Sequence, residues 1–172
     1  MKLKQISKAY IVRTLACLSF VIFFCPFLQT CSNEEIKNLP RFRGVTDKDV
    51  IKDNLINAQE NFTYNAYIFA IIPFKDFKIQ ALLEIDFYFL LIMDFIMIIS
   101  LLIIYFSFRN KFYKLKISTL ICVLLLSIYL LYFICDSIIE EITQIKYGYY
   151  LFLINLILII YFSNQLIKEQ KN

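Results

Sequence analysis

The feature that most constrains this 172-residue chain is a set of long apolar stretches with almost no charge. A hydrocarbon core about 30 Å thick needs roughly 20 mostly apolar residues in a helix. Four stretches approach this length, over residues 10–28, 87–108, 117–135 and 147–167. Because backbone polar groups in lipid must be satisfied within the segment, each stretch is predicted to be a helix. The sequence therefore predicts an all-α integral membrane protein with a bundle of four transmembrane helices.

Composition supports this class and excludes several chemistries. Hydrophobic residues make up 60% of the chain, whereas soluble domains contain about 45 to 50%. The chain has no His and no Trp, which excludes His-ligated haem, typical zinc catalysis and His-based acid–base relays. It contains no Gly-rich phosphate loop, nucleophile elbow or Cys-x-x-Cys pair. We therefore expect no enzymatic activity, no cofactor, no metal site and no nucleic acid as a partner.

The distribution of charge predicts which side of the membrane each segment faces. One set of segments consists of residues 1–9, 109–116 and 168–172. Together with Arg13, which lies close to the first of them, this set carries ten basic residues and a single acid. The two remaining connections, 29–86 and 136–146, carry eight basic residues and twelve acids. Cytoplasmic loops are enriched in Lys and Arg. The first set, including both termini, is thus predicted to be cytoplasmic, in a bacterial cytoplasmic membrane. The basic loop 109–116 either only fixes this topology or also binds anionic lipid head groups.

The longer extracytoplasmic connection, 29–86, contains signs of a small helical cap. Thr46 and Asp49 are typical of a helix start, and apolar residues follow at helical spacing, at Ile51, Leu55, Ala58 and Phe62. This pattern predicts a short amphipathic helix that lies on the bilayer or on the helix ends. The apolar run 67–74 is too short to span and is expected to be interfacial or re-entrant. In the short connection, Ser137 and Glu140 resemble a capping box and predict the start of a helix.

The first apolar stretch has two interpretations. It is either a retained helix over 10–28 or a signal peptide, because its uncharged part is short for a span. The sequence LQTC at residues 28–31, followed by SNEE, resembles the signal of bacterial lipoproteins, in which the Cys becomes lipidated and forms the new N-terminus. In that family the position before the Cys is normally Gly, Ala or Ser, and Thr30 departs from this pattern. Lipidation of Cys31 therefore remains an alternative to a retained first helix.

Asp94 is the most costly residue of the predicted spans. A charge near the bilayer centre costs roughly 2.5 to 3.5 kcal/mol even on lenient scales. Residues at helical spacing from it are apolar, so a partner must come from another helix. Counting inward from the outer boundaries places Asp94, Ser127 and Asn155 at one depth, about 11 Å inside. The sequence predicts an intramembrane polar layer of these three residues, which either stabilises the bundle or provides a proton or cation site at Asp94.

Two cysteines, Cys31 and Cys135, fall at the predicted outer boundary. In an oxidising compartment they form a candidate disulfide. This disulfide and lipidation of Cys31 are mutually exclusive, because each consumes the same sulfur atom.

Three functional hypotheses follow. The first is a non-enzymatic accessory or interaction subunit of a membrane complex, whose partners are the lipid bilayer and another membrane protein or a second copy. Asp94 would then recognise a basic residue in a partner's transmembrane helix. The second is a subunit of a proton- or ion-coupled transport system that uses Asp94. The third is a lipidated membrane protein anchored at Cys31.

Overall fold

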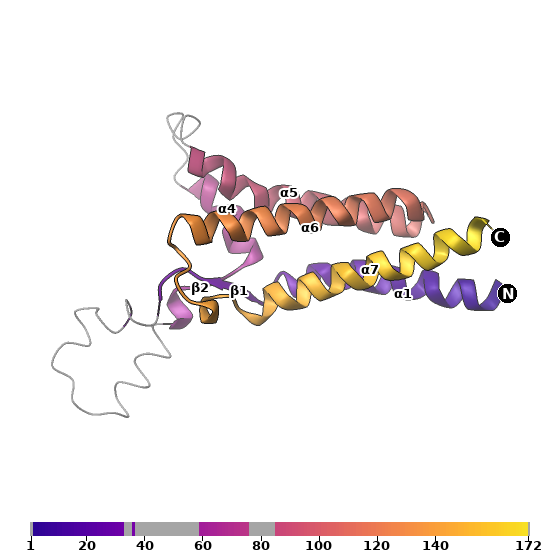
Figure 1. The fold of residues 1–172 in the computed structure, drawn as a ribbon, viewed down its shortest axis with the longest axis horizontal. Coiled ribbons are helices and arrows are strands. Elements are labelled where there is room, and N and C mark those ends of the chain that lie inside the picture. Colours follow the sequence, from indigo (N-terminus) through magenta and orange to yellow (C-terminus); the bar gives the residue numbers. More distant parts are fainter. Residues whose placement is uncertain (1, 33–35, 37–58, 76–84, 172) are drawn as a thin grey trace, which may run out of the picture.

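The structure is a computed structural model that describes residues 2–32, 36, 59–75 and 85–171. The described chain is mostly helical (Figure 1). Its long helices are α1 (Lys2–Ile22), α5 (Ile85–Phe108), α6 (Phe112–Cys135) and α7 (Tyr147–Lys171). The shorter elements are strands β1 (Pro26–Gln29) and β2 (Thr63–Asn65), helix α4 (Ala66–Lys75) and the 3-10 helix η3 (Ile142–Gln144).

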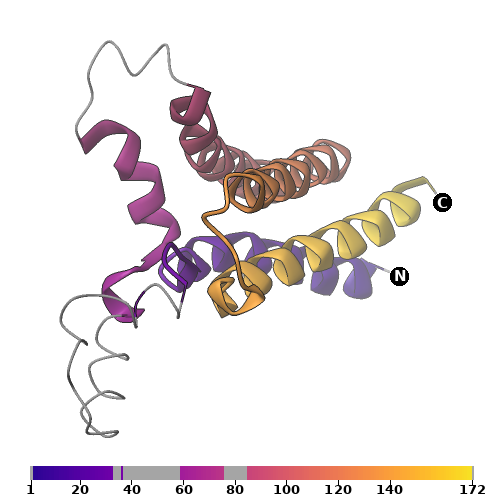
Figure 2. The same cartoon turned by 60° about the vertical axis from the view of Figure 1, so that its left-hand side comes forward.

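The four long helices lie side by side along one axis (Figures 1 and 2). Helix α1 contacts α5 and α7, and α6 contacts the same two helices from the other side. Both termini and the α5–α6 connection lie at one end, which we call the basic end because it carries Arg13, Arg109, Lys111, Lys114 and Lys116. The strands, α4 and η3 lie at the opposite end, which we call the capped end.

Among the described residues, three helices are long and apolar enough to cross a membrane. They cover Phe87–Phe108, Phe112–Cys135 and Tyr147–Gln170. The predicted stretches at 87–108, 117–135 and 147–167 lie within these helices. The second and third helices are longer than the apolar stretches, because their ends at the basic end continue into residues with Lys side chains that can extend toward water.

Helix α1 differs from the predicted stretch at 10–28. It begins at Lys2 and ends at Ile22, and a turn closed by Cys25 N donating to Ile22 O (2.9 Å) follows. Pro26 explains this end, because proline has no N–H to donate and disfavours helical backbone in the residue before it. The apolar residues Phe27 and Leu28 are buried, but they belong to strand β1.

The capped end is built on backbone pairing. Strand β1 pairs with β2 in antiparallel register, with Leu28 opposite Tyr64 and Gln29 opposite Thr63. On its other side, Leu28 forms a bridge with Ile145. The segment before α7 therefore continues the small sheet, which ties the end of α1 to the start of α7.

Helix α4 extends this cap over α5. It has 10 residues, which is too short for a span, and contacts α5 and β2. The predicted apolar run 67–74 falls within it. The amphipathic helix predicted from Thr46 lies largely outside the residues that the structure describes.

The bundle interior is apolar and rich in aromatic side chains. Phe23, directly after α1, contacts Phe152 of α7, with ring centroids 4.8 Å apart. Under the cap, Phe69 of α4 contacts Tyr129 and Phe133 of α6, at 6.0 and 5.7 Å. The outer faces expose large apolar side chains, among them Phe95, Leu124 and Ile157, as expected for surfaces in contact with lipid tails.

Candidate functional site

Asp94 lies in α5 between the bundle interior and the outer surface. Its side chain is half-buried. Its Oδ2 atom is buried and accepts no hydrogen bond from the part of the chain that the structure describes. The neighbouring positions Phe95 and Ile98 are exposed. One carboxylate oxygen thus faces the interior without a donor among the described residues, while the residue stands at the edge of an exposed apolar surface.

Tyr129 of α6 is a second buried polar residue, on a helix that contacts α5. It is fully buried. Its hydroxyl also has no hydrogen-bond partner within the described residues. Sequence analysis missed Tyr129, because a Tyr near the end of a span is typical of an interface belt.

Ser127 and Asn155 have partners other than Asp94. Ser127 is exposed on α6, and its hydroxyl donates to Val123 O of the same helix (3.0 Å). Asn155 of α7 is only 3% exposed. Its Nδ2 donates to Leu15 O (3.0 Å) and to Ser19 Oγ (2.9 Å) of α1. The hydrogen bonds of the predicted polar layer therefore connect α7 to α1 and do not join Asp94, Ser127 and Asn155.

A second polar contact links α5 to α6. Ser100 and Cys122 are both buried and share a side-chain hydrogen bond. The Ser100 hydroxyl also donates to Ile96 O (2.9 Å). Helices in lipid associate through small residues and isolated hydrogen bonds of this kind. We therefore assign Cys122 to packing.

Cys31 and Cys135 both lie at the capped end. Cys135 is the last residue of α6 and is exposed, whereas Cys31 is half-buried just after β1. The two sulfur atoms are not joined in this structure, so the disulfide and the lipidation of Cys31 stay predictions.

Cys31 also borders a cavity of about 450 Å³ between the cap and the bundle. Its wall is mainly aromatic and aliphatic and is formed by Thr30, Cys31, Phe62, Tyr64, Phe69, Ile72, Leu90, Tyr132, Phe133 and Ile138. This lining offers few groups that could orient a polar ligand.

Lys146 is the one basic residue of the α6–α7 connection. Its Nζ donates to Thr143 O (3.1 Å), and its backbone N–H donates to Phe27 O (2.9 Å). Partial burial lowers the pKa of its ammonium group, because desolvation disfavours the charged form. The residue therefore serves to hold β1 beside the start of α7.

At the basic end, two side chains of α1, Arg13 and Lys8, contact the neighbouring helices. Arg13 donates to Asn110 Oδ1 (3.0 Å) in the α5–α6 turn, and its guanidinium lies over the Phe108 ring at 5.6 Å. Lys8 forms an ion pair with Glu169 of α7. Together with Asn155, these contacts dock α1 on both neighbouring helices.

No family model, curated protein or solved structure matches this chain. Function must therefore be argued from the residues themselves. Within the described residues, no group of three or more Cys, Asp or Glu side chains is placed to hold a metal ion. Three features remain as candidates for a functional site. They are the region of Asp94 and Tyr129, the cavity at the capped end, and the polar surface of the basic end.

Proposed function

We propose that the protein spans the membrane four times, with α1 as the first span and both termini in the cytoplasm. The contacts of α1 with α5 and α7 support a retained helix, since a cleaved signal peptide would need no partners in the mature bundle. The grouping of basic residues around the termini and the α5–α6 turn supports the orientation. A bacterial cytoplasmic membrane fits this arrangement.

Cys135 offers a direct test of orientation. A variant with Cys135 as its sole cysteine, the others replaced by Ala, should react with a membrane-impermeant maleimide in intact cells. A cysteine-free variant carrying Lys111→Cys should react only after the cells are permeabilised. The opposite pattern of labelling would reverse the proposed topology.

We further propose that the protein is a non-enzymatic interaction subunit that docks on another membrane protein, or on a second copy, through the α5 surface around Asp94. The single observation that carries this proposal is the half-exposed Asp94 with a buried oxygen that lacks a donor. A carboxylate at this depth costs roughly 2.5 to 3.5 kcal/mol. A basic or hydrogen-bonding residue of a partner helix would offset this cost, and the exposed Ile98 and Leu101 would pack beside it.

The second candidate is a subunit of a proton- or ion-coupled transport system. It is supported by Asp94 and the buried Tyr129, two ionisable side chains on the contacting helices α5 and α6. Against it, α5, α6 and α7 contain no proline, whereas transport sites are commonly built on broken helices. A lipidated protein anchored at Cys31 is the third candidate, and it would lose α1.

Native mass spectrometry of the protein extracted from its own membranes separates these functions. We expect a stoichiometric second subunit, and about a tenfold loss of that complex in Asp94→Leu. Asp94→Asn should keep most of it, because an amide still forms hydrogen bonds. Ser127→Leu, which changes an exposed polar residue of α6, is the matched control and should leave the complex intact.

The remaining outcomes contradict the proposal. A lone full-length subunit in the wild type would exclude a stable complex. A proton-linked flux that Asp94→Asn abolishes would favour transport. A chain lighter by about thirty residues and carrying acyl mass would establish lipidation of Cys31.

A further inference from the structure

The basic end contains a groove between α6 and α7 that the docking surface around Asp94 does not use. Its volume is about 500 Å³, and it is lined by Tyr113, Lys116, Asn164, Ile167 and Gln170. The two α6 residues are one turn apart, and the three α7 residues follow at intervals of three. This spacing places each set on one face of its helix. The groove thus runs between the first turns of α6 and the last turns of α7.

The lining favours an anion. The Lys116 ammonium, the Tyr113 hydroxyl and the side-chain amides of Asn164 and Gln170 all offer hydrogen-bond donors. No carboxylate is among the lining residues, and the nearest acid in the α7 sequence, Glu169, is paired with Lys8 of α1. Lys116 is half-buried. The positive charge of the groove is therefore not neutralised by the described residues that line it.

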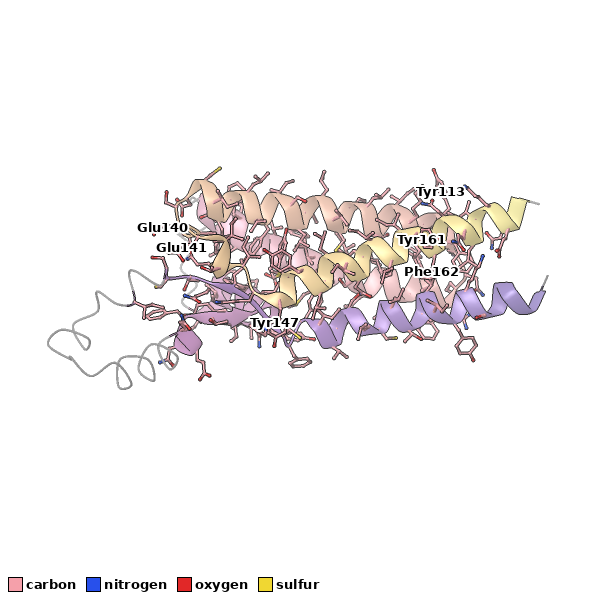
Figure 3. All side chains as sticks on the ribbon, turned by 60° about the horizontal axis from the view of Figure 1, so that its bottom comes forward. Tyr113, Glu140, Glu141, Tyr147, Tyr161 and Phe162 are labelled. Atoms are coloured by element: carbon pink, nitrogen blue, oxygen red, sulfur yellow. The ribbon has the colours of Figure 1, made fainter. Side chains whose placement is uncertain are left out.

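The position of the groove favours a lipid over a soluble anion. Tyr113 is the second residue of α6, and the topology proposed above, on which this inference rests, places it where the helix leaves the membrane. Figure 3 shows Tyr113 near the end of the bundle where α7 carries Tyr161 and Phe162, and aromatic side chains are enriched at this level. Ile167 adds an apolar wall, and the exposed Ile117 and Leu120 continue along α6 toward the membrane interior. A ligand with an anionic head group and hydrocarbon chains would match both the polar lining of the groove and the apolar surface beside it.

We propose that this groove binds the phosphate head group of an anionic phospholipid of the cytoplasmic leaflet. Lys116 neutralises the phosphate, while Tyr113 and the two amides donate hydrogen bonds to its oxygens. The acyl chains lie against the apolar outer faces of α6 and α7. Basic pockets between transmembrane helices on the cytoplasmic side bind anionic lipids on the same principle. This site is independent of any partner at Asp94.

Lipid titration of the delipidated full-length protein in detergent tests the proposal, with bound lipid counted by native mass spectrometry. Phosphatidylglycerol should bind at least about fivefold more tightly than phosphatidylcholine with the same acyl chains, as expected for one Lys near the phosphate. Lys116→Gln should remove this preference, and Lys116→Arg should restore most of it. Lys114→Gln removes the same charge from an exposed position of α6 outside the groove, and it should leave the preference within about twofold of the wild type.

Three results would overturn the proposal. The first is equal binding of the two lipids by the wild-type protein. The second is an equal loss in Lys116→Gln and Lys114→Gln, which would indicate a diffuse surface attraction. The third is a water-soluble glycerol phosphate that displaces phosphatidylglycerol at equal concentration, which would assign the groove to a soluble anion. Asn164→Leu provides a second variant that keeps all charges, and it should weaken phosphatidylglycerol binding about threefold, as loss of one hydrogen bond predicts.

Discussion

Replacing Gln144 by leucine should destabilise the folded protein by about 3 kcal/mol. Gln144 is fully buried, although it belongs to a short polar connection. Its Oε1 accepts from the N–H groups of Glu140 (2.7 Å) and Glu141 (2.8 Å). Its Nε2 donates to Ile138 O (2.9 Å) and Gln29 O (3.2 Å). Leucine has a similar volume but leaves these four backbone groups without their partner.

The measurement is reversible unfolding of the purified protein in mixed micelles. Thr143→Ala is the matched control, because Thr143 is exposed one residue away and its hydroxyl bonds only to the Glu141 side chain among the described residues. The control should change stability by less than about 0.5 kcal/mol. A loss below about 1 kcal/mol in Gln144→Leu would mean that water replaces the side chain, contrary to its burial.

Replacing Gly148 by alanine should cost about 2 kcal/mol and by valine about 3 kcal/mol or more. A Cβ atom at this position would lie 2.5 Å from Pro26 O and 3.0 Å from Cys25 Cβ. The nearest atom belongs to the backbone of β1, which the bond from Lys146 N to Phe27 O holds in place. Helix α7 and β1 would therefore have to move apart.

The direction of the stability change in Gly148→Ala distinguishes a steric clash from helix propensity. Alanine is favoured over glycine in a helix by about 1 kcal/mol, so a gain in stability for Gly148→Ala would show that the close approach of α7 to β1 does not exist. Leu151→Ala on the exposed face of the same helix controls for general changes in α7. The same unfolding measurement in mixed micelles applies.

The three longest apolar helices could be predicted from sequence because bilayer thickness fixes the length of an uncharged run. The end of α1 was not predicted, because its apolar run continues beyond the helix. Residues 23–28 are as apolar as a span, and hydrophobicity alone does not separate a buried strand from a helix. The decisive signal was Pro26, whose effect on the preceding turn outweighs the apolar composition.

The hydrogen-bond partner of Asn155 was not predicted, because the polar layer was drawn from the second, third and fourth apolar stretches only. Ser19 lies nine residues from the predicted end of the first stretch at Leu28, and Asn155 lies eight residues from the predicted start of the fourth. The same depth count, applied to the first stretch, would have placed Ser19 beside Asn155. The need of Asn155 for a partner in another helix was nevertheless predictable from its position in an apolar run.

The α6–α7 connection shows a second limit of local sequence patterns. The capping box predicted at Ser137 and Glu140 does not start a helix there. Ser137 has a positive φ of 57°, whereas a residue that caps a helix start is normally extended. The observed capping box joins Glu141 and Gln144. Gln144 also donates a hydrogen bond to the carbonyl oxygen of Gln29. A contact between residues so far apart in the sequence cannot be predicted from a local pattern.

The docking of α1 against α7 has a consequence for the order in which the protein is made. Helix α1 is synthesised well before α7, yet Lys8 and Glu169 join the two helices at one end. At the other end, Phe27 of β1 and Lys146 join the segments next to them. Until α7 is inserted, the Ser19 hydroxyl lacks the Asn155 amide and β1 lacks the segment before α7. One side of α1 therefore stays unpacked while the more than 120 residues between the two helices are synthesised. Closure of the bundle is thus a late event, and the face of α1 that α7 finally covers stays exposed until then.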